Sequence, residues 1–196
     1  MWNNFILIIC MFLSCASGWI LKKTKKKEIF KSPSWIYYSL IVLLDLLLLI
    51  CPLAFIKKCF LILLVSPLIY QCFLDFETLE LSDILSGIVL LLGIAYVIIT
   101  KQYYHIATAF LLLAIYSALS LLGPVGFGDV KLIFGLGLFV NHYLSLLFYP
   151  FLISIIFELL FRLCKKNKHG NYFAFGPYIV LGFYLTMMVF ENILIR

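Results

Sequence analysis

Residues 59–100 read CFLILLVSPLIYQCFLDFETLELSDILSGIVLLLGIAYVIIT. Two apolar runs, at 59–75 and 84–100, flank a short acidic segment, DFETLELSD, at 75–83. A helix that crosses a bilayer needs roughly 20 apolar residues, so each run has about the length of one membrane span. The stretch therefore predicts two membrane helices joined by a polar turn.

The rest of the chain has the same character. Of its 196 residues, 65% are hydrophobic and 12% are charged, with a mean hydropathy of +1.13. Soluble domains are about half apolar and about a quarter charged, so this composition excludes a soluble globule and a disordered or fibrous chain. We expect an all-α, polytopic membrane helix bundle that forms one domain over residues 1–196. The apolar runs predict eight helices, at about 5–21, 36–56, 59–75, 84–100, 104–122, 130–145, 147–164 and 174–193.

The basic residues predict the orientation of this bundle, because cytoplasmic loops carry an excess of Lys and Arg. If the lysine-rich segment 22–34 is cytoplasmic, alternation places eleven of the fifteen Lys and Arg on that side and four on the other. The eleven are Lys22, Lys23, Lys25, Lys26, Lys27, Lys31, Lys131, Arg162, Lys165, Lys166 and Lys168. We interpret the net charge of +6 as a topology signal and expect no nucleic-acid partner. The same alternation brings Asp75 and Asp129 to the cytoplasmic face.

Acidic residues at membrane depth are costly, so the nine Asp and Glu indicate where chemistry could lie. Glu158 precedes Arg162 by four residues, the spacing of an ion pair on one helix face. Asp45 has no local partner, and three interpretations stay open: a protonated side chain, a bond to another helix, or a functional group. In DFETLELSD, Ser82 or Asp83 could cap the next helix, and Asp83 is favoured.

A second polar segment, GPVGFGDVKL at 123–132, places Gly126 and Gly128 on either side of Phe127, directly before Asp129. Glycines allow positive φ and close backbone approach, which suits an irregular turn beside a carboxylate. Alone, this pattern fits a capped loop equally well. Together with Asp75, however, it suggests two carboxylates that share a proton, one acting as general base on water and the other as general acid.

The sequence lacks the motifs of two other classes of hydrolase. The sequence has no H-E-x-x-H and no G-x-S-x-G. The six cysteines form no C-x-x-C pair, and we interpret them as small apolar side chains. We therefore expect neither a metal ion nor a cofactor.

Three segments, in this order, resemble the motifs of the prepilin peptidases of type IV pilus, type II secretion and competence systems, which are GxGD intramembrane aspartyl proteases. Asp75 and Asp83 keep the spacing of the first family motif, and G-x-G-D-x-K-L is complete at 126–132. FGPY at 175–178, followed by Gly182, matches the third motif. The resemblance covers residues 70–185, the motif-bearing catalytic core.

The resemblance implies that Asp75 and Asp129 are the catalytic pair. It further implies supporting roles for Gly126, Gly128, Lys131, Asp83, Phe175, Gly176 and Pro177. The implied reaction removes the short basic leader from prepilins or pseudopilins, at the cytoplasmic face of the bacterial inner membrane.

The sequence departs from the family pattern at three places. Ser82 stands where Pro is usual, and Pro124 stands where an additional Gly is common. In many members the segment between the first two helices carries two C-x-x-C pairs, linked to zinc and to N-methylation by S-adenosylmethionine. Segment 22–34 has no cysteine, so we expect peptidase activity without methylation. Its six lysines suit either anionic membrane lipids or a topology signal.

Two other functions stay open at this point. One is a related GxGD protease that cuts other membrane substrates, although FGPY favours the prepilin branch. The other is a non-catalytic assembly or transport protein whose acids bind ions. Asp45 and Glu158 favour the second alternative, and the intact motifs argue against it.

Overall fold

The computed structural model describes residues 2–24, 34–123, 125–164 and 174–190. These residues form eight α-helices and one π-helical turn, with no strand among them, so the all-helical fold is confirmed. Residues 25–33 of the lysine-rich segment lie outside the described part, as do the side chains of Glu158 and Arg162. The elements are α1 Trp2–Thr24, α2 Ser34–Ile50, α3 Phe55–Thr78, α4 Asp83–Thr100, α5 Tyr104–Leu121, α6 Phe127–Gly137, α7 Tyr143–Cys164, α8 Gly176–Leu185 and η1 Thr186–Phe190.

The helices differ in how well their lengths match a bilayer. Four are long and apolar enough to cross it: α1 (over Asn3–Leu21), α3, α4 and α5. The helices α2, α7 and α8 contribute shorter apolar segments. With 11 residues, α6 is only about 17 Å long, roughly half of a hydrocarbon core of about 30 Å.

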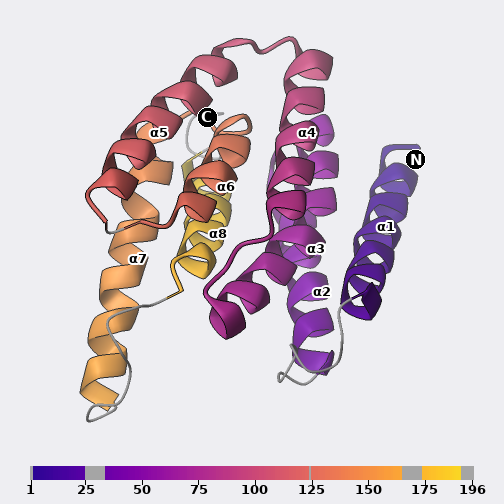
Figure 1. Cartoon of the computed structure of the whole chain (residues 1–196). Coiled ribbons are helices and arrows are strands. Elements are labelled where there is room, and N and C mark those ends of the chain that lie inside the picture. The colour runs from indigo at the N-terminus through magenta and orange to yellow at the C-terminus, as the bar shows by residue number, and fades with distance from the viewer. Residues whose placement is uncertain (1, 25–33, 124, 165–173, 191–196) are drawn as a thin grey trace.

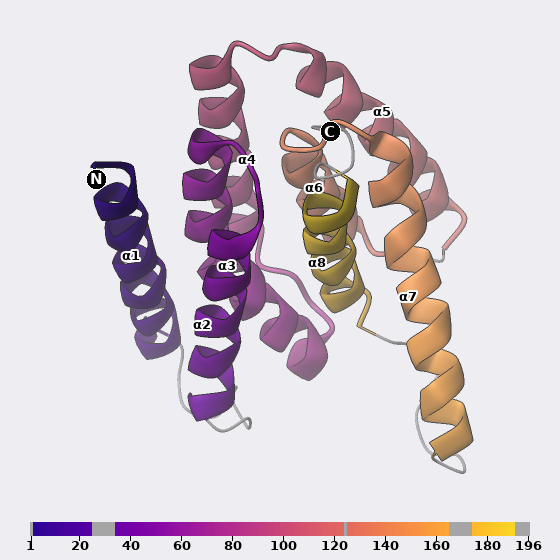
Figure 2. The ribbon, with the colours of Figure 1, turned by 180° about the vertical axis from the view of Figure 1, so that it is seen from behind.

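The helices run alternately up and down, and α3 and α8 lie inside the bundle (Figure 1). The helix α3 packs against α1, α2, α4 and α8, while α8 also packs against α6 and α7. The turns from α3 to α4 and from α5 to α6 leave the lower ends of these helices, as the view from behind also shows (Figure 2). The last turn of α3 and the first turn of α6 therefore lie at the same end of the bundle.

The helix predicted at 130–145 is shorter than expected and begins earlier. It runs over Phe127–Gly137, and residues 138–140 continue it only as tight turns, with N–H groups bonded to carbonyls three residues back. Leu138, Phe139 and Val140 are all buried. Their apolar character reflects burial in the bundle rather than a continuing helix, a distinction that hydrophobicity alone does not make.

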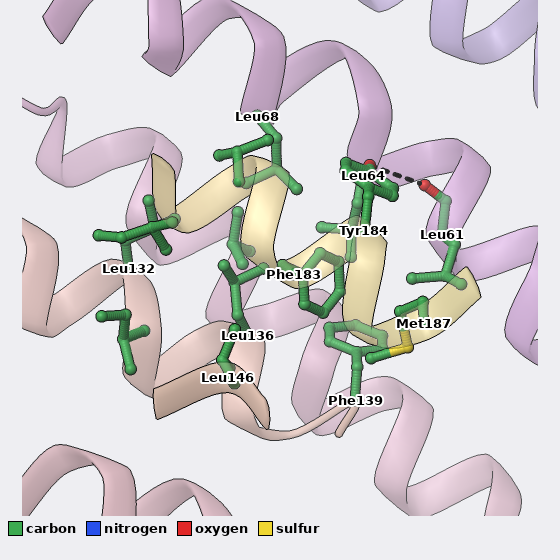
Figure 3. Packing of buried hydrophobic residues seen from close by; sticks show 14 of the residues in the cluster. Leu61, Leu64, Leu68, Leu132, Leu136, Phe139, Leu146, Phe183, Tyr184 and Met187 are labelled. Atoms are coloured by element: carbon green, nitrogen blue, oxygen red, sulfur yellow. Dashed lines mark hydrogen bonds between the residues drawn. The ribbon is translucent and has the colours of Figure 1, made fainter. Parts of the chain in front are cut away.

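The apolar core around α8 fixes the position of this helix in the bundle. Phe183 and Tyr184 project from α8 toward Leu61 of α3 and Phe139, which follows α6 (Figure 3). The Tyr184 hydroxyl lies 3.5 Å from the Leu61 carbonyl, to which it donates. This packing holds α8 between α3 and α6, with its N-terminus toward the end of the bundle that carries Asp75 and Asp129.

Close helix contacts in the bundle rely on small residues, as is usual where lipid supplies little hydrophobic drive between helices. A Cβ on Gly137 of α6 would lie 2.9 Å from the Ala109 Cα of α5. The α5 backbone therefore blocks any side chain at this position. A Cβ on Gly87 of α4, in contrast, would meet no atom within 4 Å among the described residues.

We predict that Gly137→Ala destabilises the protein while Gly87→Ala does not. Overpacking a close contact costs about 1–3 kcal/mol of unfolding free energy. An unobstructed alanine in a helix gains up to about 1 kcal/mol over glycine. Thermal unfolding in detergent should show a lower melting temperature for Gly137→Ala and an equal or higher one for Gly87→Ala. Equal melting temperatures for the two variants would contradict the close α5–α6 contact.

Candidate active site

Asp75 lies in the last turn of α3 and is buried, with 5% of its surface exposed. The helix ends at Thr78, and the left-handed conformation of the next residue, Leu79 (φ 56°), lets its N–H donate to the Asp75 carbonyl oxygen at 2.9 Å. This cap turns the chain sharply away from α3. The Asp75 side chain thus stands at a fixed helix end, beside the connection to α4.

The carboxylate of Asp75 is bound from the far end of the sequence. Its Oδ2 accepts a hydrogen bond of 2.8 Å from the backbone N–H of Gly176, the first residue of α8. A Cβ on Gly176 would lie 2.9 Å from that oxygen, so glycine leaves the space that the carboxylate occupies. The positive end of the α8 dipole also faces Asp75, an arrangement that stabilises negative charge.

Asp129 lies in the first turn of α6 and is also buried, with 7% exposed. Its Oδ2 accepts a bond of 3.2 Å from the Gly126 N–H, and its own N–H donates to the Gly126 carbonyl at 3.1 Å. This reciprocal pair holds the carboxylate over the start of its own helix. The second oxygen, Oδ1, is buried and has no hydrogen-bond partner among the described residues.

The two aspartates that the sequence predicted as a pair are both buried, at the same end of the bundle (Figure 1). One comes from α3 and the other from α6, and each accepts a backbone N–H at a helix start. Buried carboxylates in this arrangement repel when both are charged, which favours one shared proton. The pair can therefore deliver a proton and accept another at the same place.

Asp83 and Lys131 form an ion pair of 2.7 Å between the start of α4 and α6. The Asp83 carboxylate therefore does not serve mainly as the helix cap that the sequence favoured. Ser82 holds the cap position of α4, without a side-chain cap bond. Both side chains of the pair are largely solvent-exposed, so its free energy is small, about 0.2–1 kcal/mol. Its effect is to tie two elements together beside the buried carboxylates.

Phe175 and Pro177 surround the glycine that binds Asp75. Phe175 is buried, and its ring lies 5.2 Å from that of Phe151 in α7. Pro177 occupies the first turn of α8, where its fixed φ suits a helix start. These two residues hold the α8 N-terminus in place, so the three predicted residues of the C-terminal motif act as one backbone feature.

Gln71 is a buried residue of this region that the sequence analysis missed. It lies one turn before Asp75, and its Nε2 donates to the Ser86 Oγ at 3.0 Å and to the Ser82 carbonyl at 3.2 Å. It thereby links α3 to the start of α4. An amide inside an apolar run, four residues before a candidate aspartate, is the signal that could have identified it.

Asp45 lies elsewhere in the bundle. It is fully buried on α2, beside Ser14 of α1, and α2 packs against α1 and α3. This placement separates it from the start of α6, where Asp129 lies. Nor do the described residues contain any cluster of three or more His, Cys, Asp or Glu side chains able to hold a metal ion.

The central part of the chain is similar to a known protein family. The model of the type IV leader peptidase family matches residues 62–163, slightly more than half of the chain. The matched segment contains both Asp75 and Asp129, and it ends before Gly176. No curated protein and no solved structure matches the chain.

We predict opposite stability effects for two substitutions of Asp75. Asp75→Asn keeps an acceptor for the Gly176 N–H and leaves a single carboxyl where two compete to ionise, so the free energy of unfolding should equal or exceed that of the wild type. Asp75→Leu leaves that buried N–H without a partner, at a cost of about 1–3 kcal/mol. Thermal unfolding at neutral pH in detergent measures both. If Asp75→Asn destabilises the protein as much as Asp75→Leu, the bond to Gly176 does not hold this part of the fold.

Proposed function

Because the chain belongs to the type IV leader peptidase family, we propose that it is an aspartic endopeptidase that removes the short basic leader from type IV prepilins or pseudopilins. The proposed cleavage takes place at the cytoplasmic face of the cell membrane and serves pilus, secretion or competence assembly. One observation carries the proposal: the acids of two separate motifs, Asp75 and Asp129, are both buried at one end of the bundle (Figure 1), and each accepts a backbone N–H at a helix start.

The proposed reaction uses one proton shared by the pair. The ionised carboxylate takes a proton from water as the water oxygen bonds to the scissile carbonyl carbon. The protonated carboxyl then gives its proton to the amine nitrogen as the C–N bond breaks. The pair ends with one proton, as it began, and no covalent enzyme intermediate is needed.

The free acceptor on Asp129 supports a contact with substrate or water. Its Oδ1 is buried and has no protein partner in the described part of the chain, whereas Oδ2 is bound by Gly126. An unpaired buried oxygen is costly unless a ligand completes it. Asp75 accepts the shorter of the two backbone bonds, 2.8 Å from Gly176 against 3.2 Å from Gly126 to Asp129.

The charge pattern supports a cytoplasmic site. Eleven of fifteen Lys and Arg fall on one side under the predicted topology. The end of the bundle that carries Asp75 and Asp129 is also the end at which α1 finishes and α2 begins (Figure 1). The lysine-rich segment 22–34 connects those two helices, and its six lysines suit either a topology signal or anionic lipid head groups.

We predict that Asp75→Asn and Asp129→Asn each abolish leader removal. Loss of general acid or base catalysis costs at least about 100-fold in rate. The assay combines the full-length protein in membranes with a prepilin that carries a basic leader, and it follows the shortened product by gel shift and mass spectrometry. Glu80→Gln is the matched control, because Glu80 is an exposed acid in the same 75–83 segment. It should cleave at the wild-type rate.

Cleavage that survives either aspartate substitution would rule out the pair as the catalytic centre. If the wild type removes no leader from any prepilin but cuts another membrane protein in an Asp75-dependent way, the protein is a related GxGD protease. If neither occurs, a non-catalytic role replaces the proposal. Unchanged cleavage in EDTA is expected, and loss of cleavage that is restored by a metal ion would contradict the aspartic mechanism.

We further predict that the new N-terminus of the product is unmethylated. The segment 22–34 lacks the paired cysteines that the resemblance links to methyl transfer. Mass spectrometry of pilin cleaved in the presence of S-adenosylmethionine should give the mass of the unmodified product. A product heavier by one methyl group, formed only when the active protein is present, would contradict this expectation.

A further inference from the structure

Leu81 lies in the short connection from α3 to α4 and contacts the starts of both α6 and α8. A Cβ on Gly128 would lie 3.1 Å from the Leu81 Cβ and 3.5 Å from its Cδ1. A Cβ on Gly176 would lie 3.1 Å from the Leu81 Cδ2. One apolar side chain thus fills the space that two glycines leave open.

These two glycines are the neighbours of the two aspartates. Gly128 directly precedes Asp129, and the N–H of Gly176 binds the Asp75 carboxylate. The Leu81 side chain therefore packs between the backbone segments that carry or bind the two acids. Any change in its volume alters the spacing of those segments.

The connection that carries Leu81 is anchored on both sides. Before it, the Leu79 N–H donates to the Asp75 carbonyl. After it, the Ser82 carbonyl accepts from the Gln71 amide, and Asp83 pairs with Lys131 of α6. These contacts fix the backbone of the connection, so the Leu81 side chain keeps a defined place between α3 and α6. A change at this side chain shifts its neighbours, because packed interiors resist deformation.

We propose that Leu81 is a positioning residue for the peptidase reaction: packed between Gly128 and Gly176, it sets the separation of the Asp75 and Asp129 carboxyl groups. This inference rests on the proposed function. It assigns Leu81 no contact with the reacting atoms. Leu81 acts only by fixing the backbone positions of Gly128 and Gly176.

The test removes side-chain volume at Leu81 and adds it at Gly128, on the other side of their contact. Leu81→Gly removes the packing, and Gly128→Ala adds a methyl group that clashes with the Leu81 Cβ. Each single change should lower kcat about tenfold or more, with a smaller effect on KM. In the double variant the methyl group added at position 128 takes the space of the lost Leu81 Cβ. The kcat of this variant should recover to within about threefold of the wild type.

Gly176→Ala provides the matched comparison. Its Cβ would lie 2.9 Å from the Asp75 Oδ2, an obstruction that removing the Leu81 side chain does not relieve. Leu81→Gly should therefore rescue Gly128→Ala but not Gly176→Ala. Leu79→Gly is the control for the loop, since Leu79 is exposed and its positive φ suits glycine. This variant should retain wild-type kcat.

The pH profile separates positioning from general loss of structure. Two carboxyl groups that share a proton give a bell-shaped dependence of kcat on pH, and its width grows with their coupling. Leu81→Gly, and the milder Leu81→Ala if the glycine variant folds poorly, should change the width of the profile because the separation of the acids changes. An unchanged kcat and profile in a folded Leu81 variant would overturn the proposal, as would a double variant no better than its worse parent.

Failure of the proposed function has a different signature. If the wild type cleaves no prepilin, the contact is tested by the melting temperatures of the variants instead. The double-variant cycle for Leu81→Gly and Gly128→Ala should then show coupling, and the cycle for Leu79→Gly and Gly128→Ala should show none. Absence of coupling in the first cycle would overturn the role of Leu81 independently of the substrate.

Discussion

The hydrogen bond from the Gly176 N–H to the Asp75 carboxylate joins two motifs that are 101 residues apart in the chain. It is buried, and in a membrane a buried N–H or carboxylate without a partner costs several kcal/mol, so the α8 N-terminus and the end of α3 are obliged to meet. The remaining features of the site follow from this contact. Phe175 and Pro177 shape the start of α8, and α8 in turn packs between α3 and α6.

The same constraint explains why both carboxylates are bound at helix starts. Both carboxylates are buried, so each needs hydrogen-bond donors from the protein, and the first turns of helices offer N–H groups without helical partners. Asp75 uses the start of α8, and Asp129 uses the start of its own helix α6. Glycine at 126, 128 and 176 provides the room for this arrangement, since each added Cβ would meet either an aspartate oxygen or Leu81 at close range.

The sequence predicted the helical membrane fold, the break before α7 and the two aspartates at one end of the bundle, because these depend on apolar run length and on chain alternation. It did not predict the end of α6 at Gly137, since buried turns are as apolar as membrane helices. Nor did it predict the pairing of Asp83 with Lys131 or the links made by Gln71 and Leu81. Those contacts depend on the packing of α3, α4 and α6 in space, about which a single sequence carries no local signal.

The proposed mechanism depends on Asp75 and Asp129 acting together on one scissile bond. The most direct measurement is an electron cryomicroscopy structure of the wild-type protein bound to a prepilin peptide whose scissile bond is replaced by a hydroxyl-bearing, non-cleavable isostere. Such a group imitates the tetrahedral transition state. We expect its hydroxyl to lie within hydrogen-bond distance of both carboxylates, with Gly176 still bound to Asp75. An isostere seated away from either aspartate would contradict the joint action of the pair.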